Sequence, residues 1–200
     1  MTTFLWAAIG FLIGALPFSY WLGRLVLNTD IRRYGDGNPG AINAWRAGGW
    51  RLGVPASLLD YLKGAIPVGL ANSMTTVSGW GLVGVAVAPV LGHSFSPFLG
   101  FRGGKAMAAT FGIWTGLTLW EGPTILGTLI AIFFCLQRSD TWAVILGMLA
   151  FFVYLALQLD NITLMICGAN MLIITWKHRH GLRQIPRLRP WILNLSKGLR

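Results

Sequence analysis

The sequence predicts an all-α fold, a polytopic membrane bundle of about seven transmembrane helices that forms a single domain over residues 1–200. Two features of the composition predict it: 54% of the residues are hydrophobic and only 11% are charged. A soluble domain is about a quarter charged, because its surface must face water. The third observation is a mean hydropathy of +0.62. We therefore expect a surface that faces lipid.

The spans follow from the lengths of the apolar runs. A helix that crosses a bilayer needs about 20 largely apolar residues. The first such run covers residues 4–27, and Pro17 is expected to kink it. The later runs cover residues 54–76, 79–92, 105–120, 123–137, 141–157 and 162–176. The pair 105–120 and 123–137 is predicted to form a helical hairpin.

The basic residues fix the predicted orientation. With seven spans, one face receives the polar loops 28–53 and 93–104, the turn 138–140 and the tail 177–200. These segments and their edges hold every Lys and Arg except Lys63. Because cytoplasmic loops carry an excess of Lys and Arg, we expect the N-terminus outside and the C-terminus inside.

The formal net charge of +10 also bears on partners. Basic chains often bind nucleic acid through a soluble surface rich in Lys and Arg. Here the basic residues lie between apolar runs, so no nucleic-acid partner is expected. Membrane lipids with anionic head groups and phosphate-bearing substrates fit this pattern better.

Loop 28–53 carries the first candidate for phosphate binding. Its glycines Gly35, Gly37 and Gly40 allow backbone turns that point successive amides into one concavity, which binds anions. Arginines can add bidentate donors to a phosphate. The side-chain donors in this loop are Arg32, Arg33, Arg46, Asn38 and Asn43. The alternative is that these small residues form a plain connector.

Loop 93–104 carries the second candidate. Gly103 and Gly104 precede Lys105 at the predicted start of a helix, where free amides and the helix dipole attract an anion. The segment is not a P-loop, because Ala106 stands where a Ser or Thr would bind magnesium. The alternative is that Arg102 and Lys105 only anchor the chain to lipid head groups.

Other polar residues lie at the ends of spans. Asp60 and Lys63 are three residues apart and share a helix face. A charged pair inside the apolar zone is costly, so we expect it to brace loop 28–53. His93 is expected to be structural or to support a loop. His178 in the tail could orient a phosphate or a hydroxyl, although basic residues beside a membrane are often interfacial anchors.

Five segments together carry a resemblance to a known family. They are Pro17-Phe-Ser-Tyr, Asp30-Ile-Arg-Arg-Tyr-Gly with the residues up to Arg46, Leu59-Asp-Tyr-Leu-Lys-Gly, Gly92-His with Phe101-Arg-Gly-Gly-Lys, and Lys177-His-Arg. In this order they resemble the bacterial acyl-phosphate:glycerol-3-phosphate acyltransferase family over nearly the whole chain. The resemblance implies a seven-span enzyme of the bacterial inner membrane, with its active face cytoplasmic.

The resemblance also implies a reaction. An acyl chain would move from acyl phosphate to the 1-hydroxyl of glycerol 3-phosphate, giving lysophosphatidic acid and phosphate in phospholipid synthesis. The resemblance implies that no cofactor, metal or acyl-CoA is needed, and that a substrate phosphate accepts the hydroxyl proton. Catalysis would then work mainly by proximity and charge stabilisation.

Site residues follow from the resemblance by position. The catalytic residues would be Arg46, Lys105 and His178, with His178 positioning the reacting hydroxyl. Substrate phosphates would be bound by Gly35, Asp36, Gly37, Asn38, Gly40, Asn43, Arg32, Arg102, Gly103 and Gly104. His93, Asp60 and Lys63 would support these loops from below.

The chain departs from the family pattern at several of these positions. The family commonly has Ser at the position of Asp36, Thr at Ile42, Asn at Gly181 and Gly at Ala106. A carboxylate in a phosphate-binding loop repels the ligand unless a cation neutralises it. A divergent paralogue with another acceptor therefore remains an alternative. The non-enzymatic alternatives are a phosphate-binding or lipid-binding membrane protein and a transporter.

Overall fold

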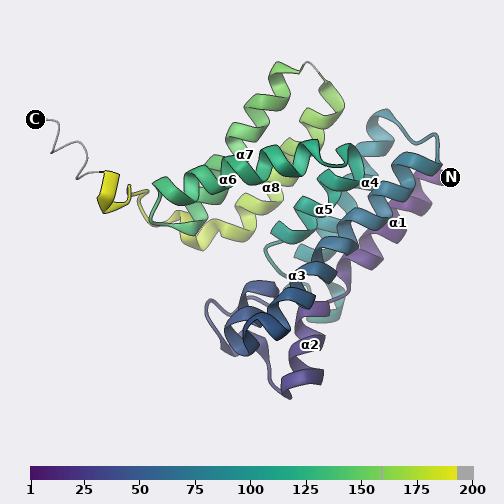
Figure 1. Ribbon diagram of the computed structural model, residues 1–200. Helices are drawn as coiled ribbons and strands as arrows, with labels where there is room; N and C mark the ends of the chain where they lie inside the picture. The colour runs from purple at the N-terminus through teal and green to yellow at the C-terminus, as the bar shows by residue number, and fades with distance from the viewer. Residues whose placement is uncertain (159, 193–200) are drawn as a thin grey trace, which may run out of the picture. The chain divides into compact units, whose positions relative to one another are not determined.

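The computed structural model describes residues 1–158 and 160–192, which form eight α-helices and two 3-10 turns and contain no β-strand (Figure 1). The predicted all-α fold is therefore confirmed. Residues 193–200 of the predicted tail lie outside the described residues. The chain divides into two compact units, residues 1–123 and 124–200, which are described separately. The single domain over 1–200 stays a prediction.

The first predicted span is two helices. Helix α1 (Thr2–Ala15) ends before Leu16, whose φ of −61° and ψ of 119° are extended, and α2 (Phe18–Leu27) begins after Pro17. The residue before a proline is pushed out of the helical region by the proline ring. The predicted kink is therefore a full break.

Loop 28–53 is shorter than predicted. After the 3-10 turn η1 (Ile31–Arg33), helix α3 (Ala41–Met74) begins directly behind Gly40. Its first turns bury Ala44 against Ile31 and Leu52, and this burial favours helix where the sequence predicts a loop. Gly49, with φ 60° and ψ −153°, bends α3 between its two parts.

The loop predicted over residues 93–104 begins and ends later in the sequence than predicted. Helix α4 (Gly79–Ser94) runs past the predicted end, so His93 lies in its last turn and not in the loop. The 3-10 turn η2 (Pro97–Leu99) follows, and α5 (Met107–Thr118) begins two residues later than predicted. Ala106 causes the delay, because its φ of 58° is left-handed and cannot continue a helix.

Close helix packing organises the first unit. In Figure 1, α1 runs beside α4 and α3 beside α5, in agreement with the contacts between them. A Cβ on Gly14 would overlap the Pro89 carbonyl, and one on Gly112 would overlap the Tyr61 carbonyl. Small residues at such crossings let helix backbones approach closely, which is how helices associate in lipid.

Helix α6 (Glu121–Leu136) leads into the second unit, which contains α7 (Asp140–Leu157) and α8 (Asn161–Leu182). Asp160 caps α8 by accepting hydrogen bonds from the amides of Ile162 and Thr163. Helix α8 runs beyond residue 176, where the tail was predicted to begin. Cations in a last helical turn are favoured by the helix dipole, and Arg179 and His180 occupy that turn.

Three described segments are long and apolar enough to cross a membrane, namely Thr2–Leu27, Gly79–Leu99 and Asp140–Leu157. The shorter helix Glu121–Leu136 is also apolar. Large apolar side chains are exposed on these helices, among them Leu5, Leu12, Leu149 and Val153, as expected of surfaces that face lipid. The count of seven spans and the orientation of the termini stay predictions.

Candidate active site

Two glycines shape the loop between η1 and α3. Gly35 has φ 58° and Gly37 has φ 76°, a region that favours glycine. A Cβ on Gly35 would overlap the Arg46 guanidinium and the Asn43 amide oxygen. The loop therefore lies directly against the first turns of α3.

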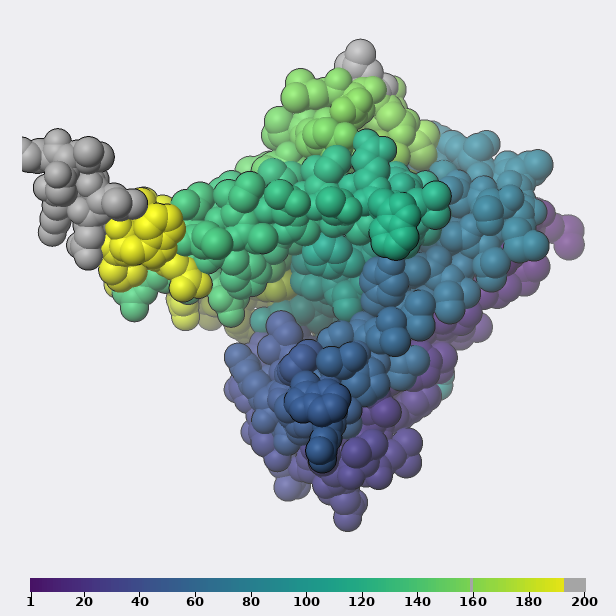
Figure 2. Space-filling model, in the orientation of Figure 1, coloured from purple at the N-terminus to yellow at the C-terminus, as the bar shows by residue number. Residues whose placement is uncertain are grey.

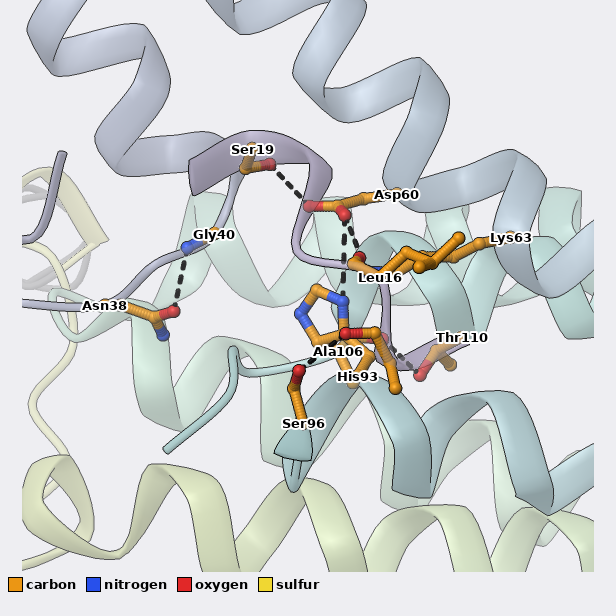
Figure 3. Close-up of polar contacts among 11 residues, drawn as sticks. Leu16, Ser19, Asn38, Gly40, Asp60, Lys63, His93, Ser96, Ala106 and Thr110 are labelled. Atoms are coloured by element: carbon orange, nitrogen blue, oxygen red, sulfur yellow. Dashed lines mark hydrogen bonds and ion pairs between the residues drawn. The ribbon is translucent and has the colours of Figure 1, made fainter. Parts of the chain in front are cut away.

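Amide side chains hold this loop in shape. The Asn43 Nδ2 donates to the Asn38 carbonyl oxygen at 2.8 Å and to Asp36 Oδ1 at 3.1 Å. The Asn38 Oδ1 accepts the Gly40 amide at 3.1 Å, at the point where α3 begins (Figure 3). Arg46 Nη1 donates to Asn43 Oδ1 at 3.2 Å. Three of the predicted phosphate donors of loop 28–53 (loop one), namely Asn38, Asn43 and Arg46, thus form one connected group.

Lys105 directly follows loop 93–104 (loop two) and joins that loop to the connected group in loop one. Its Nζ lies 2.7 Å from Asp36 Oδ2, while Asp36 Oδ1 also accepts the Asn38 amide at 3.2 Å. Partial burial raises the pKa of Asp36, but the Lys105 ammonium and the hydrogen bonds from Asn38 and Asn43 outweigh it and leave this pKa below its usual value. The carboxylate is therefore ionised and neutralised by a cation at neutral pH.

Arg32 is engaged elsewhere. Its guanidinium makes a bidentate pair with Asp30, through Nε at 3.0 Å and Nη2 at 2.7 Å, and lies over the Tyr20 ring. The Arg32 hydrogen bond lowers the pKa of Asp30 to about 2. Arg32 was predicted to bind substrate, and that role stays a prediction, but Asp30 competes for its donors.

Loop two is packed on the end of α4. The Gly104 amide donates to the His93 carbonyl oxygen at 3.0 Å, and a Cβ on Gly104 would overlap the His93 ring. A Cβ on Gly103 would overlap the His93 carbonyl oxygen. Both glycines are therefore required for this close approach, while the Arg102 side chain is exposed.

A buried polar cluster lies beside the two loops (Figure 3). Asp60 Oδ1 pairs with Lys63 Nζ at 2.8 Å and lies 3.8 Å from His93 Nδ1, and Ser19 Oγ donates to Asp60 Oδ2 at 2.6 Å. Lys63 Nζ also donates to the Leu16 carbonyl oxygen at 2.9 Å. The cluster therefore ties α2, α3 and α4 together at the Pro17 break.

Two serines of this region were not singled out as site residues. Ser19 and Ser96 are 1% and 2% exposed, and the Ser96 hydroxyl donates to the Ala15 carbonyl oxygen. Ser96 lines a small cavity together with residues of both loops, including Pro39 and Gly104. The signal available for Ser19 was its place two residues after a helix-breaking proline in an apolar run.

Ser19, Asp60 and His93 are the residue types of a hydrolytic triad, but their arrangement differs. In a triad the serine hydroxyl contacts the histidine, which the carboxylate orients. Here the hydroxyl of Ser19 donates to the Asp60 carboxylate itself and is buried. The geometry is that of a structural brace.

His178 belongs to the second unit. It lies on α8, 6% exposed, with Nδ1 2.9 Å from the Ile174 carbonyl oxygen. When Nδ1 carries the proton for this contact, Nε2 is the nitrogen that can accept one. The role of His178 as a residue that positions the reacting hydroxyl stays a prediction.

The first unit thus presents one exposed group of anion donors above a buried brace. The amides of Gly37, Asn38 and Gly40 in the glycine turn already donate hydrogen bonds within the loop. The charged members of the group, Lys105 and Arg46, come from segments far apart in the sequence. Such donors, held in place before the ligand arrives, stabilise charge on a phosphoryl group. The arrangement suits binding and transfer chemistry at a phosphate ester or anhydride.

Sequence comparisons agree with this chemistry. The chain matches the glycerol-3-phosphate acyltransferase family over residues 4–187. The glycerol-3-phosphate acyltransferase 1 of Thermotoga maritima is 40% identical over 200 residues, covering 92% of this chain and 98% of that protein. The glycerol-3-phosphate acyltransferase of Thermus thermophilus is 35% identical over 190 residues and covers 92% of each chain.

Two solved structures have a similar fold. Both are of PlsY, an integral membrane glycerol 3-phosphate acyltransferase, one in a glycerol 3-phosphate form and one in a lysophosphatidic acid form. The first has a TM-score of 0.84 at 25% identity and covers 98% of this chain and 99% of that one. The second has a TM-score of 0.81 at 26% identity and covers 92% and 91%.

Proposed function

The chain belongs to the glycerol-3-phosphate acyltransferase family, and on that premise we propose that it transfers an acyl chain from an acyl phosphate to the 1-hydroxyl of glycerol 3-phosphate. The products are lysophosphatidic acid and inorganic phosphate. The relatives named above act on glycerol 3-phosphate, and one similar structure is of a lysophosphatidic acid form. The active face is cytoplasmic, in the inner membrane of a bacterial cell.

The proposal that an acyl phosphate is the acyl donor is supported mainly by the contact of loop one with loop two at Lys105. Two substrates that each bear a phosphoryl group need two sets of anion donors. The glycine turn with Asn38, Asn43 and Arg46 supplies one set, and Lys105 with the Gly103-Gly104 segment supplies the other. The 2.7 Å contact between Lys105 and Asp36 brings the two sets together.

The proposed step needs no nucleophilic side chain. The 1-hydroxyl oxygen attacks the acyl carbonyl carbon, the bond from that carbon to the phosphate oxygen breaks, and phosphate leaves. A phosphate oxygen of a bound substrate accepts the hydroxyl proton. His178 orients the hydroxyl, while Lys105 and Arg46 stabilise the charge on the departing phosphate.

Phosphate release tests the proposal directly. The purified protein in lipid would receive palmitoyl phosphate with and without glycerol 3-phosphate. We expect release that depends on glycerol 3-phosphate, with lysophosphatidic acid formed in equal amount. No acceptor-dependent release from a folded sample would reject the proposal and favour a divergent acceptor or a binding protein.

Gly35→Ala is expected to weaken substrate binding because the added Cβ displaces Arg46 and Asn43. Gly49→Ala is a matched control, since Gly49 has a similar φ of 60° and open space where its Cβ would lie. Each variant places a Cβ at a positive φ and carries about 1–3 kcal/mol of backbone strain, measurable as thermal unfolding. Only Gly35→Ala should lower kcat/KM, by about tenfold. Equal activity in the two variants would remove loop one from the phosphate site.

Asp36→Asn tests whether a substrate phosphate displaces the Asp36 carboxylate from Lys105. Removing this competing anion should lower KM severalfold at neutral pH, where Asp36 is ionised. The pair is 35% and 45% exposed, so its loss costs only about 0.2–1 kcal/mol of stability. High salt should narrow the difference in KM, because salt screens exposed charges. A raised KM in Asp36→Asn would instead make Asp36 an organiser of the loop.

The pH dependence of this contact has a defined sign. The pKa of Asp36 is lowered in the folded protein from its usual 3.8. Its contribution to stability is therefore complete above pH 3.8 and is lost as the pH falls through the lowered pKa. Wild type and Asp36→Asn should differ in thermal stability at neutral pH and converge in strong acid.

A further inference from the structure

A basic cavity lies in the second unit, and none of the residues assigned to the substrates lines it. It has a volume of about 500 Å³, within the range of small-molecule sites. Its lining residues are Arg138, Ser139, Gln184, Ile185 and Arg187. It contains two arginines and no carboxylate, so its ligand is expected to be an anion.

The chain after α8 folds back to build this cavity. The Arg138 amide donates to the Arg187 carbonyl oxygen, and the Arg189 amide donates to the Leu136 carbonyl oxygen, both at 2.9 Å. Gln137 and Leu188 form an antiparallel bridge between these hydrogen bonds. Figure 2 shows the yellow end of the described chain lying against the green end of α6. The backbones of Arg138 and Arg187 are therefore fixed beside each other.

The three arginines of this region divide between two roles. Arg189 Nε donates to the carbonyl oxygens of Phe134 at 2.9 Å and Gln137 at 3.0 Å, which satisfies carbonyls at the end of α6. Within residues 1–158 and 160–192, the guanidinium groups of Arg138 and Arg187 make no hydrogen bond or ion pair. Arg189 thus attaches the chain after α8 to the end of α6, whereas the guanidinium donors of Arg138 and Arg187 remain available for a ligand.

Two tryptophans lie near this cavity. Trp142 Nε1 donates to the Gln184 carbonyl oxygen at 2.6 Å, and Trp191 Nε1 donates to the Cys135 carbonyl oxygen at 3.2 Å. The cavity lies where apolar α6 ends and apolar α7 begins. Indole rings concentrate at the depth of lipid head groups, so a phosphate there belongs most simply to a lipid.

We propose that this cavity binds the phosphate of an anionic phospholipid head group between Arg138 and Arg187. Guanidinium groups bind phosphate oxygens in pairs, Ser139 and Gln184 add neutral donors, and Ile185 contacts the apolar part of the lipid. Basic pockets at the ends of membrane helices recognise such head groups. The site does not depend on the acyl-transfer reaction.

The test compares two double variants of equal charge in the full-length protein. Arg138→Gln/Arg187→Gln removes both ligand donors, and Arg51→Gln/Arg183→Gln removes two arginines that do not line the cavity. Each protein in neutral detergent is titrated with phosphatidylglycerol or phosphatidylcholine, and bound lipid is counted by native mass spectrometry. We expect phosphatidylglycerol to bind at least about tenfold more weakly to the first variant only.

Equal affinity of the two double variants for phosphatidylglycerol would overturn the proposal. A third arm uses inorganic phosphate alone: if it displaces phosphatidylglycerol at equal concentration, the ligand is a free anion and the lipid assignment is wrong. If Arg138→Gln/Arg187→Gln does not fold, Arg138→Lys/Arg187→Lys replaces it. That variant keeps the charge and loses the paired donors, so an affinity equal to wild type would also reject the site.

Discussion

Replacing Lys105 with Ala is expected to reduce turnover by roughly 10²–10³-fold while leaving the protein folded. Lys105 is the basic side chain that loop two contributes at the meeting point of the two loops, and its ammonium is 2.7 Å from the Asp36 carboxylate. Under the proposed function, the same ammonium neutralises the phosphate that departs. Its removal raises the barrier at the step where negative charge moves onto that phosphate.

The fold should tolerate this change. Lys105 is 35% exposed and its single ion pair is open to solvent, so the lost stability should be within about 1 kcal/mol. Arg51→Ala, an exposed basic residue of α3, is the matched control and should keep its activity. More than a tenth of wild-type activity in folded Lys105→Ala would exclude Lys105 from catalysis.

Asp36→Asn separates the two possible roles of Lys105. If Lys105 served only to hold Asp36 and the loop, Asp36→Asn would lose as much activity as Lys105→Ala, because each breaks the same contact. If Lys105 acts on the substrate, Asp36→Asn stays active and only Lys105→Ala fails. The double variant should then resemble Lys105→Ala.

The sequence predicted the parts of the fold that depend on local chemistry. Apolar runs indicated the helices. Pro17 indicated a kink at the place where the structure has a full break between α1 and α2, because a proline acts on its immediate neighbours. The predicted ends of the helices were less accurate. A loop was predicted over residues 28–53, yet helix α3 starts at Ala41, because Ala44 is buried against Ile31 and Leu52.

Long-range pairing explains what the sequence could not predict in the site. A carboxylate at Asp36 was predicted to repel a phosphate unless a cation neutralises it. The structure supplies Lys105 as that cation, and Lys105 is far along the chain. Ser19 meets Asp60 across 41 positions of sequence. Asp30 is only two residues from Arg32, but its competition with a substrate for the Arg32 guanidinium depends on the bidentate geometry of the pair, which the sequence does not show.

Replacing Lys63 with Met is expected to cost about 3–5 kcal/mol of stability, the largest effect on the fold that we predict. The side chains of Lys63 and Asp60 are each 2% exposed, so the lost partner cannot be replaced by water. Asp60 would keep the Ser19 hydroxyl at 2.6 Å and His93 Nδ1 at 3.8 Å. The Leu16 carbonyl at the helix break would lose Lys63. Thermal unfolding in detergent measures the change.

Neutralising both members of the pair separates buried charge from packing. Asp60→Asn/Lys63→Met removes the unpaired carboxylate that Lys63→Met leaves behind, so it should recover much of the lost stability, because a buried pair is far more costly to break than to replace. The amide oxygen introduced in place of the carboxylate can still accept a hydrogen bond from Ser19. A double variant no more stable than Lys63→Met would show that Lys63 stabilises the fold mainly through its hydrogen bond to the Leu16 carbonyl at the helix break. The ion pair with Asp60 would then contribute less.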